Sequence, residues 1–270
     1  MALYARIPLA LEALAVGPVI ASENNKQHAL VSKTELVDQR VLEIKNVGYQ
    51  YPNSINASLK NVSITLEKGL MYAIVGPSGA GKTTFVDVCL GLIKPTSGEV
   101  VEIDSGIRYA YVPQHTHLSS VSLKGNVAIE WDDRFIDDDL ADTAMRQALI
   151  ENVFDGRKDD ENSSAMSGGQ MQRIGIARAL YRKPNFLVLD EATNALDAST
   201  EHEIVGLVEN LRSTMTILVV AHRLSTVRNA DKVVYLESGE IKGVGTFTEP
   251  QEKIPAFAEQ LNLGLFTQNE

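Results

Sequence analysis

The sequence predicts an α/β protein built on a mainly parallel sheet. Short, almost wholly apolar runs at residues 71–75 and 186–190 are typical of strands that are buried on both faces. Along the centre of the chain such runs alternate with stretches of helical periodicity. This alternation indicates a parallel sheet covered by helices.

The composition is that of a folded, acidic protein. The chain has 270 residues, 44% of them hydrophobic, and a formal net charge of −10. An acidic surface argues against duplex DNA binding, so no nucleic-acid partner is expected. The single cysteine, Cys89, excludes a disulfide framework within the chain and favours a reducing compartment. Its apolar neighbours predict a small buried side chain.

Residues 1–39 are expected to be an N-terminal extension. The first 23 residues are apolar, but Arg6, Glu12 and the pair Gly17-Pro18 interrupt them. These interruptions argue against a membrane span or a signal peptide and favour an amphipathic or partner-docking helix. Residues 22–39 are polar and are expected to form a linker.

The elements that follow are expected in a fixed order. Residues 41–51 and 57–69 alternate like strands, and residues 71–76 form a short apolar strand. Residues 82–93 are expected to be a helix that Pro95 stops. Its apolar positions are Phe85, Val88, Cys89 and Leu92. A further strand is expected over residues 107–113.

The second half of the chain begins with an acidic, helix-rich stretch over residues 118–165. A helix begins at the aspartates 137–139, with Leu140, Ala144 and Ala148 at helical spacing, and a loop covers 155–164. The acidic run lacks the glycine and the glutamate of a calcium loop. Strands are then expected over 186–190, 216–221 and 232–241, with a helix near 198–212.

Residues 76–83, "GPSGAGKT", match the pattern of a phosphate-binding loop between a strand and a helix. Gly76, Gly79 and Gly81 let successive backbone N–H groups point at one anion, and the helix N-terminus adds positive charge. Lys82 is expected to reach the β- and γ-phosphates, and the Thr83 hydroxyl to hold Mg²⁺.

Two further strands end in residues suited to nucleotide hydrolysis. The run "FLVLDE" places Asp190 and Glu191 at the carboxyl end of a strand, where ligand sites of α/β proteins form. Asp190 is expected to anchor Mg²⁺ through water, and Glu191 to orient or deprotonate the attacking water. The strand "TILVVAH" ends in His222, whose neutral imidazole can contact the γ-phosphate.

The stretch "MSGGQ", residues 166–170, precedes a strong helical pattern. Ser167 alone would serve as the helix cap, so the two glycines are unexplained by the helix and suggest bare backbone for a phosphate.

Together these motifs resemble the nucleotide-binding domains of ABC transporters over about residues 40–250. "GPSGAGKT" resembles Walker A, "FLVLDE" Walker B with the catalytic glutamate, and "MSGGQ" the LSGGQ signature, with Met166 in place of leucine. Gln114 in "YVPQ" resembles the Q-loop glutamine, "NALD" at 194–197 the D-loop, and His222 the switch histidine. Tyr51 matches the aromatic residue that stacks on adenine. The segment after His222 resembles the exporter branch.

The resemblance implies a P-loop NTPase core with an N-terminal antiparallel β subdomain and an inserted α-helical subdomain near residues 115–170. Residues 251–270 would be a C-terminal tail. ATP and Mg²⁺ would be the cofactors, and Gln114 would sense the metal. The implied ATP-binding residues are Tyr51, Gly76, Pro77, Ser78, Gly79, Ala80, Gly81, Lys82, Thr83 and Thr84, with Ser167, Gly168, Gly169 and Gln170 of a second protomer.

The implied function is ATP hydrolysis that powers export of a lipid, glycolipid or peptide. The chain would act as a head-to-tail homo- or heterodimer on the cytoplasmic face of a membrane, with transmembrane domains fused to it or supplied separately. The N-terminal segment resembles the end of an exporter's last membrane helix, which would make the chain a half-transporter without its channel.

The sequence departs from the exporter pattern at two places, and two alternative functions stay open. Residues 97–114 are compact, which implies a trimmed β subdomain, and residues 155–170 lack the Gly/Glu pattern common before exporter signatures. The alternatives are a soluble ABC-type ATPase not tied to transport and a nucleotide-binding module that does not hydrolyse ATP. Glu191 and His222 argue against the second alternative.

Overall fold

The computed structural model describes residues 38–150, 166–190, 198–212, 214–221, 223–255 and 257–258. The chain divides into two compact units, residues 1–39 and 40–270, and every element described below lies in the second unit. The helix expected within the first 23 residues lies outside the described residues.

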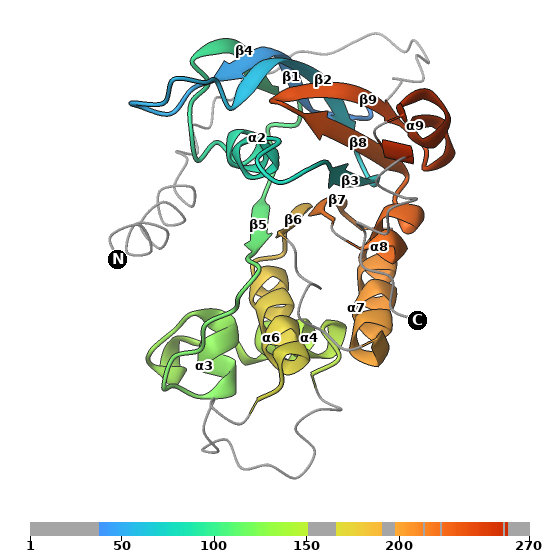
Figure 1. The fold of residues 1–270 in the computed structure, drawn as a ribbon. Helices are drawn as coiled ribbons and strands as arrows, with labels where there is room; N and C mark the ends of the chain where they lie inside the picture. The colour runs from blue at the N-terminus through green and yellow to red at the C-terminus, as the bar shows by residue number, and fades with distance from the viewer. Residues whose placement is uncertain are drawn as a thin grey trace, which may run out of the picture. The chain divides into compact units, whose positions relative to one another are not determined.

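A six-stranded sheet forms the centre of this unit, with the strand order β5-β6-β7-β3-β8-β9 (Figure 1). All neighbouring pairs are parallel except β8 and β9, so the prediction of an α/β fold with a mainly parallel sheet is confirmed. The strands are β3 (Met71–Val75), β5 (Tyr109–Val112), β6 (Phe186–Asp190), β7 (Thr216–Val220), β8 (Lys232–Glu237) and β9 (Glu240–Gly245).

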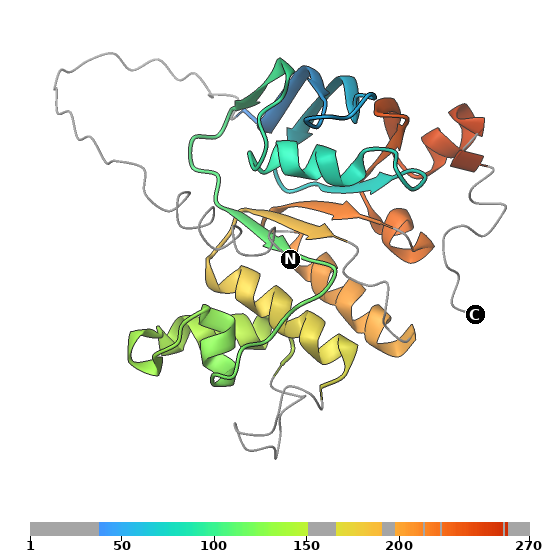
Figure 2. The same cartoon turned by 60° about the vertical axis from the view of Figure 1, so that its left-hand side comes forward.

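The sheet separates two hydrophobic cores because successive side chains of a strand point to opposite faces. In β3, Met71, Ala73 and Val75 join one core, while Tyr72 and Ile74 join the other. Helices α6, α7 and α8 cover the first face, and α2 with a second, smaller sheet covers the other (Figures 1 and 2). The helices of the unit are α2 (Lys82–Cys89), α3 (Leu123–Ala128), η1 (Asp133–Phe135), α4 (Asp138–Gln147), α6 (Gly168–Tyr181), α7 (Ala198–Leu211), α8 (Leu224–Asn229) and α9 (Thr248–Lys253).

The smaller sheet is antiparallel and has the order β2-β1-β4, as the predicted β subdomain requires. Its strands are β1 (Arg40–Tyr49), β2 (Leu59–Glu67) and β4 (Ser97–Glu102). The first two match the expected strands, whereas β4 was not predicted from the sequence. It is an edge strand with no fully buried side chain, so it carries little of the hydrophobic alternation that reveals a strand.

Helix α2 ends earlier than expected. The predicted helix ran to residue 93, but the last helical residue is Cys89, and Leu92 is 45% exposed. Gly91 adopts a left-handed φ of 66°, and its N–H donates to the Val88 carbonyl while that of Leu92 donates to Asp87. These two bonds satisfy the last carbonyls of the helix and end it. Gly91, rather than Pro95, therefore stops α2.

The prediction of a single strand over residues 232–241 is also wrong, because this segment contains β8, a turn and the start of β9. Strands β8 and β9 pair antiparallel across Ser238 and Gly239, which both have positive φ (52° and 82°). A two-residue turn of this kind matches the twist of the strands that it joins.

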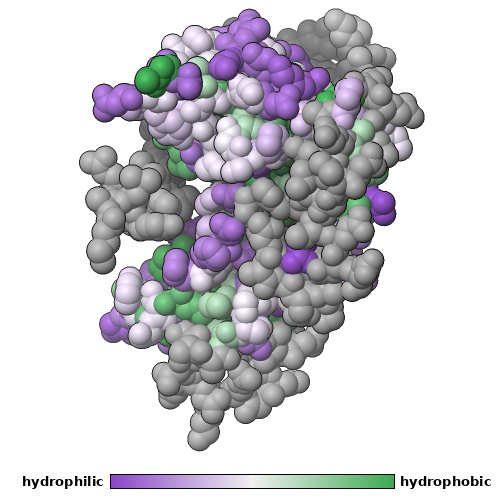
Figure 3. Space-filling model, viewed as in Figure 1, coloured by the Kyte–Doolittle hydropathy of each residue, from purple (hydrophilic) through white to green (hydrophobic). Residues whose placement is uncertain are grey.

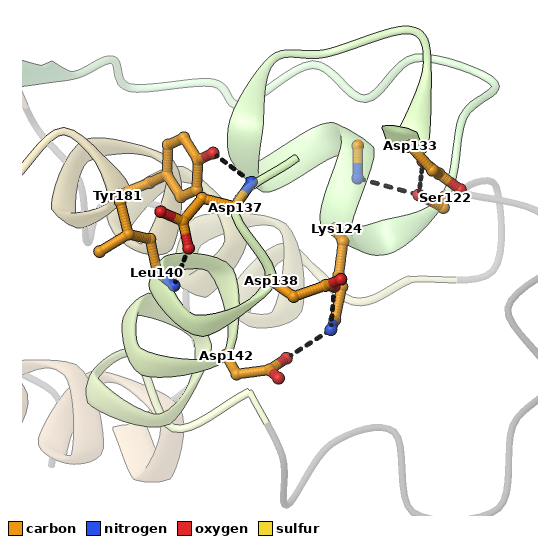
Figure 4. A network of polar contacts seen from close by, with 9 residues as sticks. Ser122, Lys124, Asp133, Asp137, Asp138, Leu140, Asp142 and Tyr181 are labelled. Carbon is orange, nitrogen blue, oxygen red and sulfur yellow. Dashed lines mark hydrogen bonds and ion pairs between the residues drawn. The ribbon is translucent and has the colours of Figure 1, made fainter. Parts of the chain in front are cut away.

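Helices α3, α4 and α6 pack together into a helical part of the unit, and surface polar contacts join them (Figure 4). The Lys124 ammonium of α3 contacts the carboxylates of Asp138 and Asp142 in α4, at 2.6 and 2.8 Å. The backbone N–H of Asp137 donates to the Tyr181 hydroxyl of α6 at 3.1 Å. Each exposed pair adds little stability, but together they fix how these short helices meet.

Candidate functional site

The loop of residues 76–83 joins β3 to α2, as predicted. Gly76, Gly79 and Gly81 have φ angles of 147°, 77° and 101°, which favour glycine. Two of them also leave no room for a side chain. A Cβ at Gly76 would lie 1.9 Å from the Leu236 carbonyl oxygen, and one at Gly81 would lie 2.5 Å from that of Ser58. The backbone path of the loop therefore depends on glycine.

Lys82 folds back over this loop. Its buried ammonium donates to the carbonyl oxygens of Gly76 at 2.8 Å and Pro77 at 3.1 Å. The N-cap of α2 is Gly81, which has no side chain to satisfy the first N–H groups of the helix. A cation and a helix N-terminus without a side-chain cap thus lie together, an arrangement suited to a phosphate.

Three predicted site positions lie at one edge of the sheet. Strands β3, β5 and β6 run parallel, so their carboxyl ends share an edge (Figure 1). The loop follows β3, the exposed Gln114 follows β5 by two residues, and Asp190 is the last residue of β6. Ligand sites of open α/β sheets form at this edge.

Asp190 has a partner that the sequence reasoning missed. The Tyr111 hydroxyl of β5 donates to Oδ2 of Asp190 at 2.8 Å. Asp87 of α2 lies near enough for the Asp190 charge to act on it. Burial, and then this charge, raise the pKa of the Asp87 carboxyl. A polar residue near the carboxyl end of β5 was the available signal, but only the strand order shows that it meets Asp190.

The side chains at this edge fit Mg²⁺. The exposed Thr83 hydroxyl and the Asp190 carboxylate offer only oxygen donors, which Mg²⁺ prefers. Among the described residues, no group of three or more His, Cys, Asp or Glu side chains could hold a metal.

Tyr51 lies beside the start of α2. Its hydroxyl lies 3.3 Å from Oγ1 of the buried Thr84, and its ring packs edge-on against Tyr49 with 4.9 Å between centroids. The side chain remains 41% exposed. An aromatic ring is therefore held near the phosphate loop with part of its surface open to a ligand.

The start of α6 carries the predicted cap. The Ser167 hydroxyl accepts the Gln170 N–H, and the Gln170 side chain accepts the Ser167 N–H, which together form a capping box. Gly169 is buried, and a Cβ there would lie 2.2 Å from Cγ2 of Thr200 in α7. Close packing of α6 on α7 is thus one reason for this glycine, in addition to any phosphate contact. Ser167 and Gly168 are exposed.

Several predicted site residues lie outside the described residues. These are Glu191, the segment 194–197 and His222.

Comparison with known proteins identifies the family. The family model described as ABC transporter matches residues 59–194, which is half of the chain. The chain belongs to the ABC transporter family. The predicted family is thereby confirmed, and ATP binding follows from it.

Curated relatives of the ABC domain are named as a flippase and as an ABC transporter. The chain is 36% identical over 225 residues to an ATP-dependent lipid A-core flippase of Ralstonia nicotianae, covering 77% of this chain and 38% of that protein. It is 34% identical over 222 residues to ABC transporter B family member 13 of Arabidopsis thaliana, covering 77% of this chain and 18% of that protein. The chain therefore spans less than half the length of these relatives.

The ABC fold is matched by a solved structure, that of a bacterial Atm1-family ABC exporter with ATP bound. The TM-score is 0.74 at 24% identity, covering 99% of this chain and 48% of that chain. This likeness confirms the predicted fold class. Within the described part of this chain, no helix is both long and apolar enough to cross a membrane.

Proposed function

We propose that this chain is the ATP-hydrolysing subunit of a membrane exporter. The observation that carries the proposal is the edge of the sheet where the glycine-dependent loop, Lys82 and Asp190 lie at the ends of parallel strands. This edge is where a P-loop ATPase binds its nucleotide.

Each predicted site residue has a proposed role. Tyr51 stacks on the adenine, and the N–H groups of residues 76–84 hold the phosphates. Lys82 leaves its carbonyl partners for the β- and γ-phosphates. Thr83 and Asp190 hold Mg²⁺, and Gln114 senses it. When bound, Mg²⁺ neutralises the charge that develops on the phosphates. Glu191 accepts a proton from the attacking water, and His222 contacts the γ-phosphate.

The proposed active form is a head-to-tail dimer. In both views the start of α6 lies on the opposite side of the sheet from α2, away from the phosphate loop of its own chain (Figures 1 and 2). The exposed Ser167 and Gly168 are nevertheless suited to an anion, since they begin a helix of 14 residues. A phosphate of the ATP bound to the partner protomer would accept hydrogen bonds from these two residues.

The proposed membrane partner would contact the helical part. Three large apolar side chains lie exposed between α3 and α4: Ile129 at 51%, Trp131 at 76% and Phe135 at 74%. Figure 3 shows apolar surface in the region of α3. Exposed apolar side chains that gather in one segment are typical of a protein interface. We infer that a membrane domain binds there, which would place this chain at the cytoplasmic face of the membrane. The complete exporter would then move a lipid, glycolipid or peptide.

The variant Glu191→Gln tests the hydrolytic role. Removal of the general base should leave ATP affinity within about twofold and slow phosphate release by about 10²-fold or more. The variant should therefore accumulate as an ATP-bound dimer in size-exclusion chromatography. The control is Glu209→Gln, which changes an exposed carboxylate on α7 and should retain the parent rate.

Two results would contradict the proposal. An unmodified chain that binds no ATP would exclude the nucleotide site. A Glu191→Gln variant that hydrolyses ATP at the parent rate would exclude the role of Glu191.

A further inference from the structure

Tyr111 and Asp190 lie on neighbouring strands and meet on the face of the sheet that α2 covers. Strands β5 and β6 are in parallel register, with Tyr111 opposite Val188, two residues before Asp190. Val188 belongs to the core under α2, and the partly buried Tyr111 packs against that core. The hydrogen bond between the Tyr111 hydroxyl and the Asp190 carboxylate is therefore set by the pairing of the two strands.

The same strand contains a second tyrosine, whose hydroxyl binds a different carboxylate. Tyr109 also packs on this core, but its hydroxyl donates to Glu102 in β4, at 2.9 Å. Two tyrosines of one strand thus bind two carboxylates, and only one of these carboxylates, that of Asp190, lies at the carboxyl edge of the six-stranded sheet. Tyr109 is a built-in control for any effect of Tyr111.

The hydrogen bond restricts how Asp190 can turn. A hydroxyl donor to a carboxylate is a charge-assisted bond, and a part-buried one holds its acceptor oxygen in place. Asp87 on α2 lies close enough to act on Asp190 electrostatically, and two carboxylates repel each other. The Tyr111 hydroxyl therefore helps to set the orientation of the Asp190 carboxylate.

We propose that Tyr111 is a positioning residue for the ATPase site, whose hydroxyl orients the Asp190 carboxylate for Mg²⁺ binding. The inference rests on the proposed function, because it assumes that Asp190 helps to hold the metal. Tyr111 also lies three residues before Gln114, so one short segment bears both the positioning hydroxyl and the proposed metal sensor.

The test measures how much the metal strengthens nucleotide binding. The full chain is titrated with a fluorescent, non-hydrolysable ATP analogue in excess Mg²⁺ and again in EDTA, and the ratio of the two affinities is taken. For Tyr111→Phe the ratio should fall about tenfold, the size typical of a lost outer-shell partner, with unchanged affinity in EDTA. Tyr109→Phe should keep the parent ratio, and Tyr111→Phe should add no further loss to Asp190→Asn.

Hydrolysis provides a second readout. The ATPase rate of Tyr111→Phe should recover to the parent value as Mg²⁺ is raised, because only the metal affinity is reduced. A general packing defect would not be rescued in this way. Thermal unfolding of each variant checks that the fold is retained.

The outcomes separate this inference from the proposed function. If Tyr111→Phe keeps the parent ratio, or loses affinity equally in Mg²⁺ and EDTA, Tyr111 does not position Asp190. If the unmodified chain binds the analogue with no dependence on Mg²⁺, or not at all, the proposed metal-dependent ATPase site is wrong.

Discussion

Ser167 and Gln170 cap the N-terminus of α6 with two reciprocal hydrogen bonds. The Ser167 hydroxyl oxygen accepts the Gln170 N–H at 3.2 Å, and Oε1 of Gln170 accepts the Ser167 N–H at 2.9 Å. Because the serine oxygen acts as an acceptor here, its hydrogen remains to donate to another group. One side chain can therefore cap the helix and contact a phosphate at the same time.

The variant Ser167→Asp should separate these two roles. Aspartate caps a helix as well as serine does, so the free energy of unfolding should stay within about 0.5 kcal/mol. Its charge would repel a phosphate, so the ATP-bound dimer formed in the Glu191→Gln background should be lost. Ser167→Ala is the control and should lose about 1 kcal/mol of stability. Chemical denaturation and size-exclusion chromatography measure the two effects, and a Ser167→Asp dimer of parent strength would exclude the phosphate contact.

Gly169 and Thr200 give a second prediction, which concerns packing. A methyl group at Gly169 would overlap Cγ2 of Thr200, so Gly169→Ala should destabilise the chain by about 1–3 kcal/mol. Thr200→Ala removes the overlapping atom and should restore part of this loss in the double variant.

A double-mutant cycle by chemical denaturation checks the coupling. Strictly additive effects would show that the packing of Gly169 against Thr200 does not limit the residue at this position. The double variant, in which the overlap with Thr200 is removed, is then tested for dimer formation with ATP. A loss of the dimer in this variant would indicate that Gly169 also contacts a phosphate.

The phosphate loop gives a third prediction from two glycines of one motif. Gly76→Ala places a methyl group 1.9 Å from the Leu236 carbonyl oxygen and should cost about 3 kcal/mol or more. A Cβ at Gly79 meets nothing within 4 Å, so Gly79→Ala should cost only the backbone strain of about 1–2 kcal/mol. Denaturant unfolding with and without ATP measures both. Equal losses would show that β8 does not confine the loop.

Local features of the site could be predicted from the sequence. The strand, loop and helix around residues 71–89 are adjacent in the chain, and the cap at Ser167 is a pattern of four residues. In both cases the interacting groups lie close in sequence, so spacing alone reveals them. The end of α2 was misjudged because apolar periodicity continues past Gly91, while the backbone turns there.

Long-range contacts could not be predicted in the same way. Tyr111 and Asp190 are 79 residues apart, and they meet only because β5 is the neighbour of β6. Gly169 approaches Thr200 because two helices cross closely, which no periodicity encodes. In these cases the strand order or the helix packing decides the chemistry, and a single sequence does not specify either.

Tyr51 gives the last prediction, on adenine recognition. Its ring is held edge-on by Tyr49 and its hydroxyl lies near Thr84, so the exposed part of the ring is fixed before a ligand binds. Base stacking is worth about 1–3 kcal/mol, so Tyr51→Ala should weaken ATP binding about 5- to 150-fold. Tyr51→Phe keeps the ring and should stay within about threefold. Calorimetric titration with ATP measures both, and with a second ligand, inorganic triphosphate, neither variant should differ from the parent. Tyr51 does not stack on the base if Tyr51→Ala binds ATP as tightly as the parent. The same conclusion follows if the variant loses as much affinity for inorganic triphosphate as it loses for ATP.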